Sequence, residues 1–265
     1  MLTLVFIVIL SFCLRIYQVG TDSFWFDEAG IALAVTTDTP GQMIKIVEEH
    51  AAAMPLDYMV AWVMARFYVS DGWLRLPSVL WGVATIIICA ALFREMGNQT
   101  ISALGALFLA LSAIHIHYSQ ELKFYASEIF FYMLSTYLIW KLLHDPTWKK
   151  SFWLIVLTII GIYFHIYVLL SLTTGFIWIW VKRKDKDSKK AWVYYLLSVI
   201  LIVLATIPGY LFFNMDREYS FYVDLLSAIA PISTGLGWVP LLHSNTYDAG
   251  WLWGSELPQD KWTAS

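Results

Sequence analysis

Long apolar stretches separated by short polar segments are the feature that most constrains the fold of this 265-residue chain. A membrane-spanning helix needs about 20 mostly apolar residues. Hydrophobic residues make up 59 % of the chain and charged residues 14 %, against about 45–50 % and 25 % in soluble domains. We therefore predict an all-α polytopic membrane protein and exclude a soluble or disordered chain. The clearest candidate spans are residues 2–19, 74–93, 101–118, 126–143 and 191–213.

The stretch from Phe152 to Val181 is too long for one span and too short for two full spans. A single helix would measure about 45 Å and two helices about 22 Å each, against a hydrocarbon core of about 30 Å. Lys149 and Lys150 precede the stretch and the basic run 182–190 follows it. Because cytoplasmic loops carry the excess of Lys and Arg, both clusters belong on one side. We predict two short helices with a hairpin near His165.

We predict that the chain lies in the plasma or inner membrane. The resulting seven spans place the N-terminus on the cytoplasmic side and most acidic residues on the outer side. Arg15, at the outer end of the first span, is expected to snorkel to the surface. Residues 1–213 form the predicted transmembrane module, and its outer loop 20–73 carries an interfacial helix over 55–69. The segment 214–265 follows outside the membrane without a closing span, so we expect the chain to be incomplete at its C-terminus.

Two adjacent carboxylates, Asp27 and Glu28, follow the aromatic residues Phe24, Trp25 and Phe26 directly outside the first span. In a structural interpretation, Asp27 is an N-cap and Glu28 lies in the first turn of a short helix. In a functional interpretation, the pair supplies a base or a metal ligand whose pKa is raised by burial against the aromatic rings.

Further polar residues lie on the same predicted outer face, where ionisable groups near a membrane indicate function. The structural alternatives are a solvated loop with a Glu121–Lys123 pair, an interfacial anchor at Arg75 and a structural histidine at His165. The functional alternative for Arg75 is a cation facing a phosphate. The residues concerned are Arg75, His165 and the segment Gln120, Glu121, Lys123 and Tyr125.

Four segments, in order over roughly residues 15–180, resemble motifs of the GT-C superfamily, and of family 39 glycosyltransferases in particular, the relatives of protein mannosyltransferases and aminoarabinose transferases. Two departures stand out: Met54 precedes Pro55 where the family often has His, and Lys123 replaces the usual Arg. The segments are Phe24-Trp25-Phe26-Asp27-Glu28-Ala29, Pro55-Leu56-Asp57-Tyr58, Arg75-Leu76-Pro77-Ser78 and Tyr118-Ser119-Gln120-Glu121-Leu122-Lys123-Phe124-Tyr125-Ala126.

The resemblance implies a GT-C-like transmembrane helix bundle with a long first extracytoplasmic loop. It also implies transfer of a sugar from a polyprenyl-phosphate monosaccharide to a lipid, glycan or protein acceptor outside the cytoplasm, with inversion. Asp27 would act as general base, with Glu28 orienting the acceptor or supporting Asp27. Lys123, Arg75 and Arg217 would bind the donor phosphate. The substrate-binding residues would be Gln120, Glu121, Tyr125, His165, Trp25 and Tyr58.

The resemblance requires no cofactor, and we predict no required metal, with a divalent cation at the two carboxylates as the alternative. The net charge of −3 gives no basis for nucleic-acid binding. A transporter or flippase of a polyprenyl-linked sugar and a non-catalytic membrane scaffold are the competing functions. Transporters commonly place polar groups near mid-membrane, whereas here they cluster at one face, with Glu128 as the main exception. This distribution favours surface chemistry.

Overall fold

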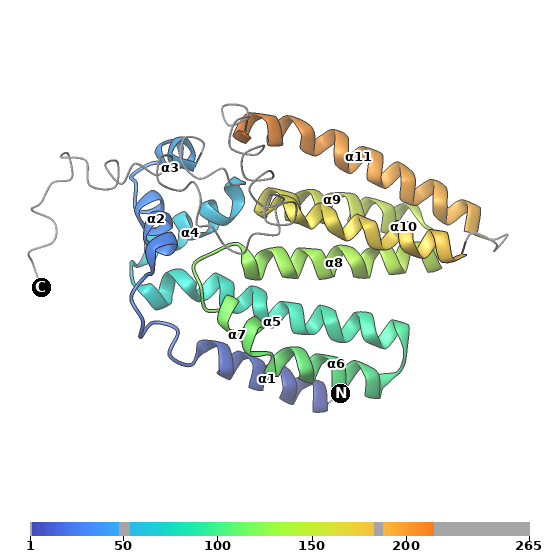
Figure 1. The fold of residues 1–265 in the computed structure, drawn as a ribbon, viewed down its shortest axis with the longest axis horizontal. Coiled ribbons are helices and arrows are strands. Elements are labelled where there is room, and N and C mark those ends of the chain that lie inside the picture. Colours follow the sequence, from blue (N-terminus) through green and yellow to red (C-terminus); the bar gives the residue numbers. More distant parts are fainter. Residues whose placement is uncertain (1, 48–53, 183–187, 215–265) are drawn as a thin grey trace, which may run out of the picture. The chain divides into compact units, whose positions relative to one another are not determined.

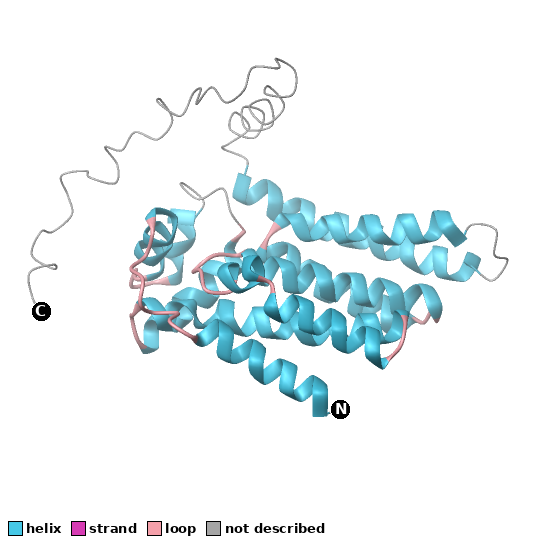
Figure 2. Ribbon diagram, turned by 60° about the horizontal axis from the view of Figure 1, so that its bottom comes forward, coloured by secondary structure: helices cyan, strands magenta, loops and turns pink. Residues whose placement is uncertain are grey.

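The structure, a computed structural model, describes residues 2–47, 54–182 and 188–214, and every regular element within these ranges is a helix (Figure 2). The fold class predicted from the sequence is thus confirmed at the level of an all-helical chain. In chain order the elements are α1 (Leu2–Ile16), α2 (Phe26–Val35), α3 (Pro40–Ile46), α4 (Pro55–Phe67), α5 (Asp71–Met96), α6 (Gln99–Leu111), α7 (Ala113–Tyr118), α8 (Tyr125–His144), α9 (Trp148–Phe164), the 3₁₀ helix η2 (Ile166–Leu170), α10 (Ser171–Lys182) and α11 (Ser188–Asn214).

The long helices lie side by side, and the short helices α2, α3 and α4 gather at one end of them (Figure 1). Helix α5 packs against α1, α6 and α8, and α8 packs against α9 and α10. Among the described helices, α5 and α11 are long and apolar enough to cross a membrane, and α1, α6 and residues 166–181 are shorter apolar helices. The count of seven spans therefore stays a prediction.

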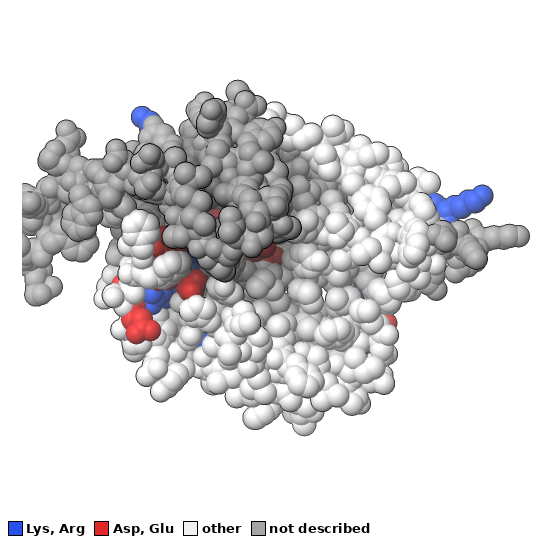
Figure 3. Space-filling model, viewed as in Figure 1, with Lys and Arg blue, Asp and Glu red and all other residues white. Residues whose placement is uncertain are grey.

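Small and hydroxyl-bearing residues join the long helices, as is usual where helices pack within lipid. A Cβ at Gly161 would lie 2.5 Å from Cβ of Phe131. Side-chain hydrogen bonds cross between helices at Ser135–Thr158 (2.9 Å) and Ser151–Ser198 (2.7 Å). Large apolar side chains such as Phe108 and Leu204 point outward and are exposed. The charged residues visible in Figure 3 lie toward the two ends of the molecule, with a broad uncharged face between them.

The hairpin predicted near His165 is present. Helix α9 ends at Phe164, and His165 has an extended backbone (φ −157°, ψ 136°) that leads into η2. Helix α10 then returns toward the end of the bundle at which α9 begins (Figures 1 and 2). A helix predicted over 55–69 is also present as α4, and its position at the membrane interface stays a prediction.

The single span predicted over residues 101–118 is wrong, because the helix breaks at Ser112. The extended backbone of Ser112 (ψ 114°) ends α6, and its hydroxyl accepts a hydrogen bond from the His115 amide as α7 begins. Apolar residues continue beyond Ser112 at Ala113, Ile114 and Ile116, so hydropathy alone does not mark the break. The break matters because α7 leads into the polar segment 119–124.

Arg15 does not snorkel to the surface as expected but is completely buried. Its Nη1 donates to the Ala110 carbonyl (3.2 Å) and the Ser11 hydroxyl (2.8 Å), and its Nη2 lies 2.7 Å from Nδ1 of His115. The carbonyls in the last turn of α6 have no partner within that helix. They carry the negative end of its dipole. The break after α6 therefore provides the acceptors that hold the Arg15 guanidinium inside the bundle.

Candidate active site

Segments far apart in the sequence meet at the end of the bundle that carries the short helices. Helices α2 and α4, the first turns of α5 and the segment 119–124 pack on one cluster of buried apolar residues. Burial of these side chains fixes the backbones that carry the polar residues of the site. The cluster consists of Ile31, Val35, Ala61, Ala65, Leu74 and Leu122.

Glu28 and Arg75 form a buried, bidentate ion pair that joins α2 to α5. Arg75 Nε lies 2.9 Å from Oε1 of Glu28, and Nη2 lies 2.6 Å from Oε2. The Glu28 side chain is 0 % exposed and that of Arg75 6 %. Glu28 also accepts from the Leu122 amide at 2.6 Å. A two-pronged guanidinium–carboxylate contact fixes geometry as well as charge, so Glu28 holds three segments together.

The remaining N–H groups of Arg75 donate to the loop between α1 and α2. Their acceptors are the carbonyls of Val19 (3.0 Å), Asp22 (2.8 Å) and Ser23 (3.5 Å). With the two bonds to Glu28, these contacts use the five donors of a guanidinium. The structure thus gives Arg75 partners within the protein at every donor, and its binding of a donor phosphate stays a prediction. The aromatic ring of Phe24 lies 5.1 Å from the guanidinium.

Asp27, the neighbour of Glu28, pairs with Lys123 at a more open position. Lys123 Nζ donates to Oδ2 of Asp27, and the side chains of Asp27 and Lys123 are 39 % and 14 % exposed. The ammonium also lies 5.2 Å from the ring of Trp25 and 5.6 Å from that of Tyr125. Asp27 is not the N-cap of α2, because the helix begins at Phe26 with Trp25 at the cap. The predicted Glu121–Lys123 pair is replaced by this contact.

The segment 119–124, which delivers Lys123, is bonded at several points. The Gln120 amide donates to the carbonyls of Arg15 (3.1 Å) and Tyr17 (2.8 Å) at the end of α1. The ring of Phe124 stacks on that of His165 at 3.8 Å. Gln120 and His165 thus contact the segment that carries Lys123, and their predicted binding of substrate stays a prediction.

A second polar cluster adjoins the first and contains two acids that the sequence analysis did not place in the site, Asp57 and Glu128. The Ser127 hydroxyl donates to Asp57 at 3.1 Å, and Nδ1 of His165 lies 2.8 Å from Glu128. Burial raises the pKa of the Asp57 carboxyl to about 6, although the Ser127 hydrogen bond and the nearby His165 act in the opposite direction. The signal was in the sequence, because both acids lie in mostly apolar helical runs.

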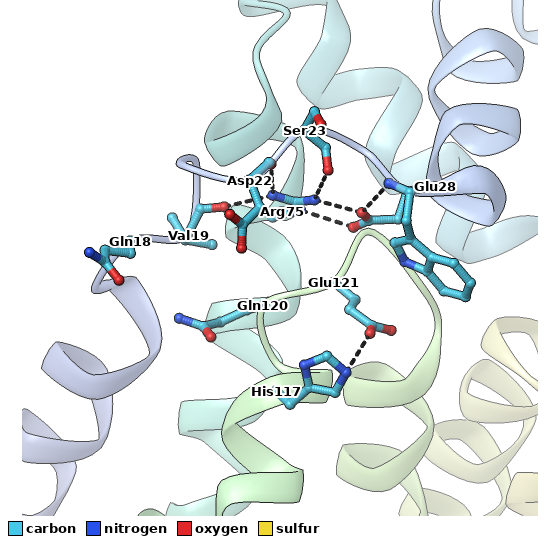
Figure 4. Close-up of a pocket in the computed structure, with 10 residues that line it drawn as sticks. Gln18, Val19, Asp22, Ser23, Glu28, Arg75, His117, Gln120 and Glu121 are labelled. Carbon is cyan, nitrogen blue, oxygen red and sulfur yellow. Dashed lines mark hydrogen bonds and ion pairs between the residues drawn. The ribbon is translucent and has the colours of Figure 1, made fainter.

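An open cavity of about 420 Å³ lies between the loop after α1 and the end of α7 (Figure 4). Glu121 lies on its wall, with Oε1 3.0 Å from Nε2 of His117. Burial raises the pKa of Glu121. The lining residues are Gln18, Val19, Asp22, Ser23, Trp25, Glu28, Arg75, His117, Gln120 and Glu121.

Three further residues were predicted for the site: Tyr58, Tyr125 and Arg217. Tyr58 packs against the apolar cluster of the site, and the ring of Tyr125 is tilted against that of Tyr118, with centroids 4.7 Å apart. Arg217, like the segment after Asn214, lies outside the described residues. Within the part of the chain that the structure describes, no group of three or more His, Cys, Asp or Glu side chains could hold a metal ion.

Comparison with known proteins places these observations in a family. The model of the dolichyl-phosphate-mannose-protein mannosyltransferases matches residues 51–210, which include Arg75, Lys123 and His165, while Asp27 and Glu28 precede the matched range. No curated protein and no solved structure matches the chain. Since the match covers more than half of the sequence, the chain belongs to this membrane-embedded GT-C family of glycosyltransferases.

Proposed function

We propose that the protein transfers a sugar from a polyprenyl-phosphate monosaccharide to an acceptor hydroxyl on the extracytoplasmic side of the membrane, with inversion at the anomeric carbon. The observation that carries this proposal is the half-open Asp27–Lys123 pair beside the buried Glu28–Arg75 pair. The family match supports the donor class. The predicted topology, with most basic residues at the opposite end of the bundle, supports the extracytoplasmic face.

Asp27 is the proposed general base. The acceptor hydroxyl passes its proton to the Asp27 carboxylate while its oxygen bonds to the anomeric carbon. The bond from that carbon to the phosphate oxygen breaks, and polyprenyl phosphate leaves with the electron pair. Because a phosphate monoester is a stable anion, the leaving group needs no general acid. Attack from the side opposite the phosphate inverts the anomeric configuration.

Lys123 is the proposed partner of the donor phosphate. An ammonium has three N–H donors, so the bond to Asp27 leaves donors for a phosphate oxygen. A cation placed where negative charge develops stabilises the transition state. Lys123 can thus balance the charge of the base and of the leaving group in turn.

Glu28 supports Asp27 and does not itself act as a base. Its oxygens accept hydrogen bonds from Arg75, from the Leu122 amide and, at 3.4 Å, from the Trp25 amide. These bonds hold α2 and the segment 119–124 in register, which sets the contact between Asp27 and Lys123. Of the two roles that the resemblance offers for Glu28, the geometry favours support of Asp27 over orientation of the acceptor.

A transfer assay on membranes tests the proposal. Radiolabelled polyprenyl-phosphate sugars are supplied as a panel, and the release of free polyprenyl phosphate is followed. Asp27→Asn should lower the rate by about 10²–10⁴-fold, the usual contribution of a general base. Asp145→Asn is the matched control, because Asp145 is an exposed acid at the C-cap of α8 that pairs with Lys150.

Release by the wild type and by Asp145→Asn, but not by Asp27→Asn, is the expected result. Equal release by Asp27→Asn would overturn the role of Asp27. No release by the wild type from any donor of the panel would contradict transfer and favour a transporter or a scaffold.

A further inference from the structure

The cavity beside the proposed catalytic pair has the size and the walls of a binding site. Its volume of about 420 Å³ lies within the range of about 300–1,000 Å³ that is usual for small-molecule sites. The loop after α1 forms one wall and the end of α7 with the following residues forms the other (Figure 4). Both walls are fixed, the first by the bonds from Arg75 and the second by those from Gln120.

The charged groups around the cavity are mainly acidic. Asp22, Glu28 and Glu121 contribute carboxylates, and Arg75 is the one Lys or Arg among its described lining residues. Because the N–H groups of Arg75 are bonded to Glu28 and to backbone carbonyls, they are not directed to a ligand. An anion entering this cavity would meet carboxylates without a compensating cation, which is a costly arrangement.

Glu121 presents an oxygen that needs a hydrogen-bond donor. The residue is only 8 % exposed, and its Oε1 contacts His117. Its Oε2 is buried and has no hydrogen-bond partner among the described residues. A buried carboxylate oxygen without a donor is unfavourable, and a hydroxyl or amino group of a ligand would satisfy it.

Trp25 connects the cavity with the catalytic pair. Trp25 lines the cavity, and its ring lies 5.2 Å from Nζ of Lys123. Lys123 in turn pairs with Asp27, so Trp25 lies between the residues of the cavity and the catalytic pair. The cavity therefore adjoins the pair at which the proposed proton transfer takes place.

We propose that this cavity binds the acceptor of the transfer reaction and selects neutral or cationic groups rich in hydroxyls or amines over anionic ones. The inference rests on the proposed function, since it names the acceptor class for that same site. Asp22 and Glu121 supply the selection, and Trp25 supplies the surface against which the acceptor packs.

Ligand binding to the purified protein in nanodiscs, without donor, tests this inference. Saturation-transfer NMR is recorded with methyl glucoside, glucosamine and glucuronate, three sugars of similar size that are neutral, cationic and anionic. The wild type should bind methyl glucoside and glucosamine and should bind glucuronate at least about tenfold more weakly. Glu121→Gln should reduce the preference for glucosamine over glucuronate by about tenfold.

Two further variants keep the test decisive. Asp22→Asn changes an exposed residue of the opposite wall and should shift the preference in the same direction, even if Glu121→Gln does not fold. Glu95→Gln is the matched control, since Glu95 is outside the cavity and pairs with Lys141. Equal binding of glucuronate and methyl glucoside by the wild type would overturn the inference, as would a preference unchanged in both cavity variants. Because no donor is present, a failure of transfer leaves this readout intact.

Discussion

At the residue scale, the two neighbouring carboxylates of α2 lie in opposite environments. Glu28 is completely buried and bonded on both oxygens, whereas the Asp27 side chain is 39 % exposed and pairs with one flexible cation. A base must reach its substrate, and a buried, saturated carboxylate cannot. In the proposed function, the same dipeptide therefore supplies one group for chemistry and one for alignment.

The Glu28–Arg75 pair gives a stability prediction. Arg75→Met leaves the Glu28 carboxylate buried without its partner, and such a change typically lowers the free energy of unfolding by about 3–5 kcal/mol. Replacing both residues by Met removes the unpaired charge, so the double variant should be clearly more stable than Arg75→Met. Thermal unfolding of the purified variants in detergent measures both effects. A double variant no more stable than Arg75→Met would show that the pair does not act as a unit.

Asp57 gives a prediction of pH dependence. The pKa of its carboxyl in the folded state, about 6, lies above the ordinary value of 3.8. Between these two pH values, Asp57 is protonated in the folded state and ionised in the unfolded state. Stability should therefore fall as the pH rises from about 4 to about 6. The free energy of unfolding should fall by at most about 3 kcal/mol, which is the free-energy equivalent of the shift in pKa.

Asp57→Asn removes this titration while keeping an oxygen that can accept from Ser127. The variant should match the wild type near pH 4 and exceed it in stability above pH 6, as measured by unfolding at both pH values. A variant that is less stable than the wild type at every pH would contradict the raised pKa.

The residues of the site were largely predictable from the sequence, but their pairing was not. Asp27, Glu28, Lys123 and Arg75 were found because charged groups are costly beside a membrane. That Arg75 bonds Glu28, 47 positions away, depends on the packing of α2 against α5 through α4. No local sequence pattern predicts which residues form this pair. The contact between Asp57 and Ser127 likewise depends on the packing of two helices that are distant in the sequence.

At the element scale, the break between α6 and α7 is what aims the segment 119–124 at α2. Arg15 bonds the end of α6, and Ser119 fits against Gly82 of α5. Hydropathy predicted one continuous span here, because apolar residues flank Ser112 on both sides. The break near His165 was predictable because charge on both flanks required an even number of crossings.

Gly82→Ala tests this packing. An added Cβ would lie 2.7 Å from Cβ of Ser119 and would overlap its hydroxyl. The segment carrying Lys123 must then shift, so we expect a loss of stability of about 1–3 kcal/mol together with slower transfer. Adding Ser119→Gly to the Gly82→Ala variant should restore part of the stability and part of the transfer rate. Gly41→Ala is the matched control, because no atom lies within 4 Å of its added Cβ. Equal behaviour of the two alanine variants would contradict the close approach.

At the scale of the whole molecule, the polar site and the basic loops lie at opposite ends of the helices. Helix α1 runs from the N-terminus toward the site, whereas the turn between α8 and α9 lies at the far end (Figure 1). Arg94, Lys149 and Lys150 lie at that far end, and basic residues concentrate on the cytoplasmic side. The helix directions thus agree with a site that faces outward.

Cysteine labelling tests this orientation. Cys13 and Cys89 are first replaced by Ser, and a single cysteine is then introduced at Thr36 or at Lys149, both of which are exposed. Thr36→Cys, after α2 at the site end, should react with a membrane-impermeant maleimide in intact cells. Lys149→Cys should react only after permeabilisation. The opposite pattern would place Asp27 and Lys123 in the cytoplasm. The acceptor would in that case come from the cytoplasmic side. The two ends are far enough apart to lie on opposite sides of a membrane, because the 26 residues of α5 correspond to about 39 Å.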